Sequence, residues 1–123
     1  MNQFKIQKPL ISLYKENRPW GKFEKYVENE QCTIKILYLN PYSKTSLQMH
    51  KYRDEFWKVL EGSAQVELEE TKFYASKGDT VQIHKNLKHR ASTNAKPCVI
   101  MEISLGDFDE DDIIRFEDEY NRI

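Results

Sequence analysis

The chain has 123 residues, with 19 basic and 20 acidic side chains and a formal net charge of −1. This balance excludes the strongly basic surface by which a domain binds nucleic acid. No apolar stretch approaches the ~20 residues of a membrane-spanning helix, and the N-terminus lacks the apolar core of a signal peptide. We therefore expect a cytoplasmic protein that binds neither nucleic acid nor membrane.

The charge is unevenly distributed along the chain. The segment from Asp107 to Glu119 holds eight acids against one base, a net charge of −7, which leaves +6 for the rest of the chain.

The length predicts one domain, residues 1–123. Within it we expect an N-terminal arm at 1–17, a barrel at about 18–106 and an acidic C-terminal segment at 107–123.

Apolar and polar residues alternate through the middle of the chain. This period of two is typical of half-buried strands. In chain order, the apolar patterns predict strands around Cys32–Tyr38, Ala64–Leu68, Val81–Ile83 and Pro97–Leu105. Turn-forming residues separate them, so the pattern predicts an all-β sandwich or barrel. Only Ile113–Phe116, flanked by acids, predicts a short C-terminal helix.

The two cysteines, Cys32 and Cys98, both lie in apolar runs. Free cysteine is among the residue types most often buried, and disulfides are rare in the cytosol. We predict two buried free thiols, with a single disulfide between them as the alternative.

The polar side chains that are best suited to bind a metal lie close together in the predicted barrel. Gln48 and His50 are two residues apart and so point to the same side of a strand, and Glu55 follows after a gap the length of a turn. His89 comes later, before another strand. Two imidazoles, a carboxylate and an amide oxygen suit Zn²⁺, and also Mn²⁺, Fe²⁺, Co²⁺ or Ni²⁺. The alternative for each histidine is an ordinary surface or core residue.

These residues also resemble two known sequence motifs. Gln48-x-His50, then Glu55, then Gly62 resembles the first cupin motif, with Gln48 in place of its first histidine. Gly78 followed by the segment that ends at His89 resembles the second.

Five blocks narrow the resemblance to one family. They resemble the type II mannose-6-phosphate isomerases, the C-terminal isomerase domain of mannose-1-phosphate guanylyltransferase/mannose-6-phosphate isomerase. The blocks are Arg18–Gly21, Ser46–His50, Arg53–Trp57, His89–Arg90 and Asp111–Asp118. The resemblance implies a cupin, a double-stranded β-helix or jelly-roll barrel, and a homodimer. No Gly-rich nucleotide loop is found, so we expect the isomerase domain to stand alone.

The resemblance further implies a set of roles for individual residues. Gln48, His50, Glu55 and His89 would hold the metal. Glu102, which interrupts an apolar strand, is the first candidate for the catalytic base, with an outward-facing carboxylate as the alternative.

Four basic residues are further candidates for the site. Lys51 is a second candidate for the base, with an ordinary solvated lysine as its alternative. Arg53, Arg90 and Arg115 are expected to bind the substrate phosphate, because a guanidinium binds phosphate through two parallel hydrogen bonds. For Arg115 a salt bridge to neighbouring acids is the alternative.

Three hypotheses for the function follow. The first is a metal-dependent isomerase that interconverts mannose 6-phosphate and fructose 6-phosphate through a cis-enediol and feeds GDP-mannose and polysaccharide synthesis. The second is a non-catalytic sugar- or metal-binding cupin that acts with a separate guanylyltransferase. The third is a cupin epimerase or isomerase that acts on another sugar phosphate or a nucleotide sugar.

Overall fold

The computed structural model describes residues 9–120. Contacts divide the chain into two compact units, Met1–Glu30 and Gln31–Ile123. The described part of the first unit contains one antiparallel hairpin, formed by β1 (Tyr14–Arg18) and β2 (Gly21–Lys25). The domain boundaries expected from the sequence stay a prediction, and residues 1–8 and 121–123 of the predicted arm and C-terminal segment lie outside the described residues.

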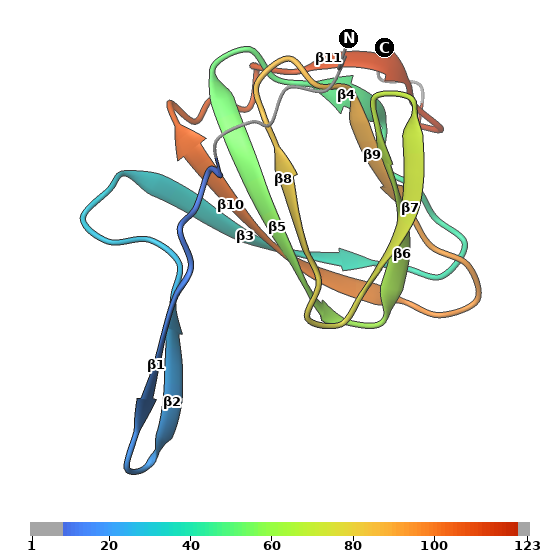
Figure 1. Ribbon diagram of the computed structural model, residues 1–123. Coiled ribbons are helices and arrows are strands. Elements are labelled where there is room, and N and C mark those ends of the chain that lie inside the picture. Colours follow the sequence, from blue (N-terminus) through green and yellow to red (C-terminus); the bar gives the residue numbers. More distant parts are fainter. Residues whose placement is uncertain (1–8, 121–123) are drawn as a thin grey trace, which may run out of the picture. The chain divides into compact units, whose positions relative to one another are not determined.

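The second unit consists of two antiparallel sheets that face one another (Figure 1). The four-stranded sheet has the order β3-β10-β5-β8, and the five-stranded sheet has the order β11-β4-β9-β6-β7. The strands of the first sheet are β3 (Cys32–Leu39), β5 (Arg53–Glu61), β8 (Thr80–Ile83) and β10 (Cys98–Gly106). Those of the second are β4 (Leu47–Met49), β6 (Ser63–Leu68), β7 (Thr71–Ser76), β9 (His89–Ser92) and β11 (Ile114–Glu117).

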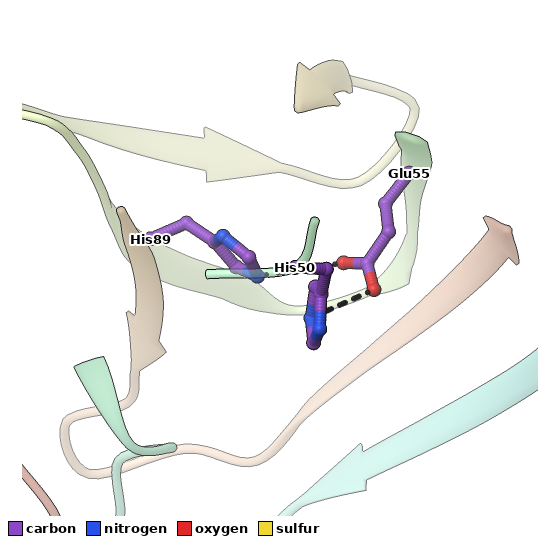
Figure 2. Close-up of side chains that lie close together, drawn as sticks. All are labelled: His50, Glu55 and His89. Carbon is purple, nitrogen blue, oxygen red and sulfur yellow. Dashed lines mark ion pairs between the residues drawn. The ribbon is translucent and has the colours of Figure 1, made fainter. Parts of the chain in front are cut away.

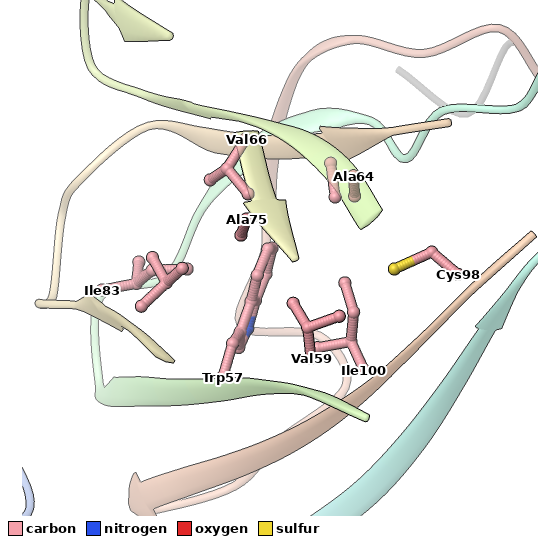
Figure 3. Packing of buried hydrophobic residues seen from close by; sticks show 10 residues of the cluster. Trp57, Val59, Ala64, Val66, Ala75, Ile83, Cys98 and Ile100 are labelled. Atoms are coloured by element: carbon pink, nitrogen blue, oxygen red, sulfur yellow. The ribbon is translucent and has the colours of Figure 1, made fainter. Parts of the chain in front are cut away.

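The fold confirms the all-β cupin barrel and the four strands expected from alternation. The core fills the space between the sheets, where Trp57 and Val59 from one sheet meet Val66 from the other (Figure 3). Each of these side chains is at most 3% exposed. Within residues 9–120 there is no helix, and so none that could cross a membrane.

The predicted short C-terminal helix is wrong. Ile114–Glu117 forms the strand β11, which pairs antiparallel with β4, so that Ile114 lies opposite Met49. A helix here would leave that edge of β4 without hydrogen-bonding partners, which a paired strand provides. The tertiary partner therefore overrides the local pattern.

The inward face of β3 also differs from the apolar pattern. Ile34, Ile36 and Tyr38, which share one face by alternation, are 57%, 39% and 76% exposed. The opposite face points inward, and its residues Leu37 and Leu39 pack against the core. The strand was predicted correctly, but the apolar alternation marks its outer face.

The two cysteines are free, as predicted. Cys98 is buried at the end of the core, whereas Cys32 is only half-buried.

Two glycines with positive φ differ in how closely other atoms approach them, so their alanine variants can be compared directly. A Cβ on Gly62 (φ +75°) would overlap the carbonyl oxygen of Pro97, whereas a Cβ on Gly78 (φ +92°) would meet no atom within 4 Å. Both alanine variants carry the cost of a left-handed backbone, about 1–2 kcal/mol. We expect Gly62→Ala to lose about 1–3 kcal/mol more from overpacking, measured by urea unfolding. Equal losses in the two variants would contradict this close approach.

Candidate metal centre and adjoining cavity

Three side chains that could hold a metal ion converge between the two sheets (Figure 2). His50 follows β4, Glu55 lies on β5, and His89 begins β9. One donor atom from each lies within 4.8 Å of the others. His50 Nε2 is 3.2 Å from Glu55 Oε2, and His89 Nε2 is 3.5 Å from Glu55 Oε1. All three side chains are at most 2% exposed, so the cluster is shielded from water.

Hydrogen bonds orient both imidazoles toward this point. Nδ1 of His50 lies 2.6 Å from the carbonyl oxygen of Asp112, and Nδ1 of His89 lies 2.9 Å from that of Leu87. A carbonyl oxygen only accepts, so each Nδ1 donates, and in a neutral ring the lone pair is then on Nε2. Burial lowers the pKa of His50, which favours the neutral ring.

The donor set fits a cation. Two imidazole lone pairs and a carboxylate facing one another repel unless a proton or a metal ion lies between them. His89 Nε2 is buried and has no hydrogen-bond partner within the described part of the chain. In metal sites a ligating histidine usually donates its other ring N–H to a backbone carbonyl or a carboxylate, as the Nδ1 atoms of His50 and His89 do here.

Glu55 is the centre of this cluster. Burial alone would raise its pKa, but the nearby His89, followed by His50 and Arg53, outweighs burial and lowers the pKa to about 2. Arg53 Nε donates to one carboxylate oxygen and Trp57 Nε1 to the other, both at 3.2 Å. The carboxylate is therefore ionised across the physiological pH range.

Gln48 lies beside the cluster but presents its amide nitrogen to it. The Ser46 hydroxyl donates to Gln48 Oε1, and Gln48 Nε2 is 3.3 Å from His50 Nε2. An amide ligates a metal through its oxygen, so Gln48 would have to rotate its amide by about 180° to serve as a ligand. Its role as the fourth ligand stays a prediction.

A cavity of about 350 Å³ adjoins the cluster, which is within the range of small-molecule sites. Glu55, Gln48 and Glu102 line it. Glu102 is only 7% exposed, and burial, reinforced by the charge of Glu55, raises its pKa to about 7. Its cross-strand neighbour on β3 is Lys35. The carboxylate of Glu102 therefore faces inward.

The four predicted basic residues occupy different places. Arg53 and Arg115 line the cavity. Arg90 is not among the lining residues, and its guanidinium is bonded to the carbonyl of Thr45 and to the Glu117 carboxylate. Lys51 is exposed and is likewise absent from the lining; its backbone N–H donates to Asp112.

Three residues of the site were missed in the sequence. Lys35 and Lys44 both line the cavity, and Asp112 positions the His50 ring. Lys35 is the single charged residue of β3, which is a signal that could have revealed it. The contact of Asp112 with the His50 ring could not be predicted from its residue type, because a backbone carbonyl makes this contact.

Residues 7–118 of this chain match a known protein family, the mannose-6-phosphate isomerase C-terminal domain. The chain belongs to this family. Relatives of this isomerase family include the alginate biosynthesis protein AlgA of Pseudomonas putida, 36% identical, and the xanthan biosynthesis protein XanB of Xanthomonas campestris, 34% identical. Each match covers 85% of this chain but only 22% and 23% of the relative. The chain thus spans less than a quarter of the length of these relatives.

Solved structures agree with the fold. The capsular polysaccharide assembling protein CapF of Staphylococcus aureus matches with a TM-score of 0.65 at 16% identity, covering 86% of this chain and 34% of that one. A cupin-superfamily sugar phosphate isomerase from Silicibacter pomeroyi matches with a TM-score of 0.58 at 21% identity, covering 63% of this chain and 52% of that one. At these identities the similarity concerns the fold.

Removing a histidine of the cluster should remove the metal. Loss of a residue that only supports a ligand costs about 10–100-fold in metal affinity, so we expect His50→Ala and His89→Ala to lose more than this. The measurement is metal content by elemental analysis after dialysis. His84→Ala is the matched control, because His84 is outside the cluster and should retain the metal of the unchanged protein. A full equivalent retained by His89→Ala would rule out this ligand set.

The raised pKa of Glu102 predicts a pH dependence of stability. The folded protein holds this proton until about pH 7, whereas the unfolded chain releases it near its ordinary pKa of 4.5. The free energy of unfolding should therefore fall as the pH rises from about 4.5 to 7. In metal-free protein, Glu102→Gln should show a smaller loss between pH 5 and pH 8, measured by urea unfolding. Parallel losses in the two proteins would show that Glu102 is not the group responsible.

Proposed function

We propose that this chain is a metal-dependent aldose–ketose isomerase that interconverts mannose 6-phosphate and fructose 6-phosphate through a cis-enediol. The observation that carries the proposal is that one cavity is lined both by Glu55 of the His50–Glu55–His89 cluster, which could hold a metal, and by Glu102, which could act as a base. Membership of the mannose-6-phosphate isomerase family supports the choice of substrate. The product would feed GDP-mannose and polysaccharide synthesis, in line with the names of the relatives.

The chemistry needs a cation and a base. His50, Glu55 and His89, with Gln48 as the fourth proposed ligand, would hold Zn²⁺ or another divalent ion such as Mn²⁺, Fe²⁺, Co²⁺ or Ni²⁺. When bound, such an ion acts as a Lewis acid toward the sugar oxygens and favours the negatively charged form of the enediol. The remaining task is to move one proton between C1 and C2.

Glu102 is the residue best suited to move this proton. A general base works best when its pKa is near the working pH, and the pKa of Glu102 is about 7. Its burial in the cavity wall keeps competing water away from the carboxylate. Lys51, the second candidate from the sequence, is exposed and has no such support. Taking the proton at one carbon and returning it at the next leaves Glu102 unchanged after each turnover.

The positive charges of the cavity wall would attract the phosphate. Arg53 and Arg115, two of the three arginines expected from the sequence, line the cavity together with Lys35 and Lys44. The geometry gives no support to the third, Arg90. A dianionic sugar phosphate is drawn toward such a concentration of positive charge.

The second hypothesis is a non-catalytic sugar- or metal-binding cupin that acts with a separate guanylyltransferase. Relatives such as the mannose-1-phosphate guanylyltransferase ManC of Salmonella typhimurium are matched over only 22% of their length. No observation favours the third hypothesis, a cupin epimerase or isomerase acting on another sugar phosphate or a nucleotide sugar.

Homodimer formation and a cytoplasmic location stay predictions. Sedimentation velocity would test whether the protein forms a homodimer.

A coupled assay of mannose 6-phosphate conversion tests the isomerase. Metal-replete protein should turn over the substrate, and a chelator should abolish the activity. Glu102→Gln should lower kcat by about 10²–10⁴-fold, the usual contribution of a general base, whereas Lys51→Ala should not. No turnover by metal-replete protein would exclude the isomerase and favour the binding cupin. A large loss in Lys51→Ala alone would assign the base to Lys51.

A further inference from the structure

Four cations line the cavity, and three of them already have a carboxylate partner. Arg53 pairs with Glu55 at 3.2 Å, Lys35 with Glu110 at 3.0 Å, and Lys44 with Glu119 at 3.7 Å. The fourth is Arg115.

The guanidinium of Arg115 makes no hydrogen bond or ion pair with any residue from 9 to 120. Its Nε is buried without a partner, although acids surround it in the sequence. A buried donor left without a partner costs about 1–3 kcal/mol, and more when the group is charged. The five N–H donors of arginine fit the oxygens of a phosphate or carboxylate. A guanidinium in the cavity wall whose Nε has no partner among residues 9–120 points to an anionic ligand.

Strand pairing sets the backbone distance between Arg115 and the metal cluster. Arg115 on β11 is the direct partner of Gln48 on β4, and Gln48 is the direct partner of His89 on β9. Adjacent strands are about 4.8 Å apart, so the backbones of Arg115 and His89 are separated by about 10 Å across one sheet. A ligand that spans this distance has an anionic group at one end and metal-binding oxygens at the other.

We propose that Arg115 is the anchor for the phosphate monoester of the substrate and sets the preference for phosphorylated over neutral sugars. The inference rests on the proposed function for the identity of the sugar, but not for the anion subsite itself. Arg53 has a different role, because its Nε is bonded to Glu55 and its Nη1 donates to the carbonyl of Asp109 at 3.0 Å. Arg53 stabilises the buried carboxylate, and Arg115 is left to receive the ligand.

Calorimetric titration of metal-replete protein with fructose 6-phosphate and with fructose tests this assignment. Arg115→Gln should weaken binding of fructose 6-phosphate by about 10–100-fold, the range expected for charge-assisted hydrogen bonds, and leave fructose binding unchanged. Arg115→Lys should lose less, since it keeps the charge but not the paired donors. Lys72→Gln is the control: it also removes one positive charge, but at a 62% exposed side chain outside the cavity lining. It should bind as the unchanged protein does.

Two outcomes would overturn the inference. One is unchanged binding of fructose 6-phosphate by Arg115→Gln. The other is an equal loss for both sugars, which would mean that Arg115 shapes the cavity without recognising the anion.

A second arm separates this inference from the isomerase activity. Inorganic phosphate is titrated into metal-free protein and followed by ³¹P NMR. Binding that Arg115→Gln removes and Lys72→Gln retains would support the anion subsite even if the protein turns over no sugar. No phosphate binding to the unchanged protein, together with no preference for fructose 6-phosphate over fructose, would overturn the inference.

Discussion

The buried, ionised carboxylate of Glu55 is the constraint on which the rest of the site depends. It is 1% exposed, and a charge at such a position is unfavourable by several kcal/mol unless hydrogen bonds and opposite charges compensate it. Arg53 and Trp57 on β5 donate to this carboxylate, whereas His50 after β4 and His89 on β9, from the other sheet, direct their Nε2 atoms at it. The charge is therefore stable only in the closed barrel, and a divalent cation would complete its compensation.

The acidic C-terminal segment supports this arrangement through its backbone as well as through its charge. The carbonyls of Asp109 and Asp112 accept hydrogen bonds from Arg53 and His50, and the Asp112 carboxylate holds the turn after His50 through two backbone N–H groups. The ring of Phe108 lies 4.6 Å from the guanidinium of Arg53, within the range of a cation–π contact. The acidic segment Asp107–Glu119 is thus part of the wall of the site, and its negative charge balances cations of the barrel.

Short-range spacing accounts for only part of the metal cluster, because His89 lies far along the chain and its role rests on the resemblance to the second cupin motif. Two residues on one face of a strand and a third across a turn are fixed by local spacing, which is why His50 and Glu55 were found. The inward position of Lys35 was not predictable in this way, since alternation separates two faces but does not say which one the neighbouring strands bury. The strand at Ile114–Glu117 was missed for a related reason: a four-residue amphipathic segment is ambiguous, and the open edge of β4 decides its conformation.

The short strand β4 connects the two ends of the proposed ligand site. It has only three residues and lies between β9 and β11, so its position depends on both neighbours. Gln48 at its centre pairs with His89 on one side and with Arg115 on the other. Any shift of β11 would therefore move the anion subsite and loosen the strand that leads into His50. A sugar phosphate held at both ends would have its reacting carbons fixed relative to Glu102, which is the positioning that proton transfer between adjacent carbons requires.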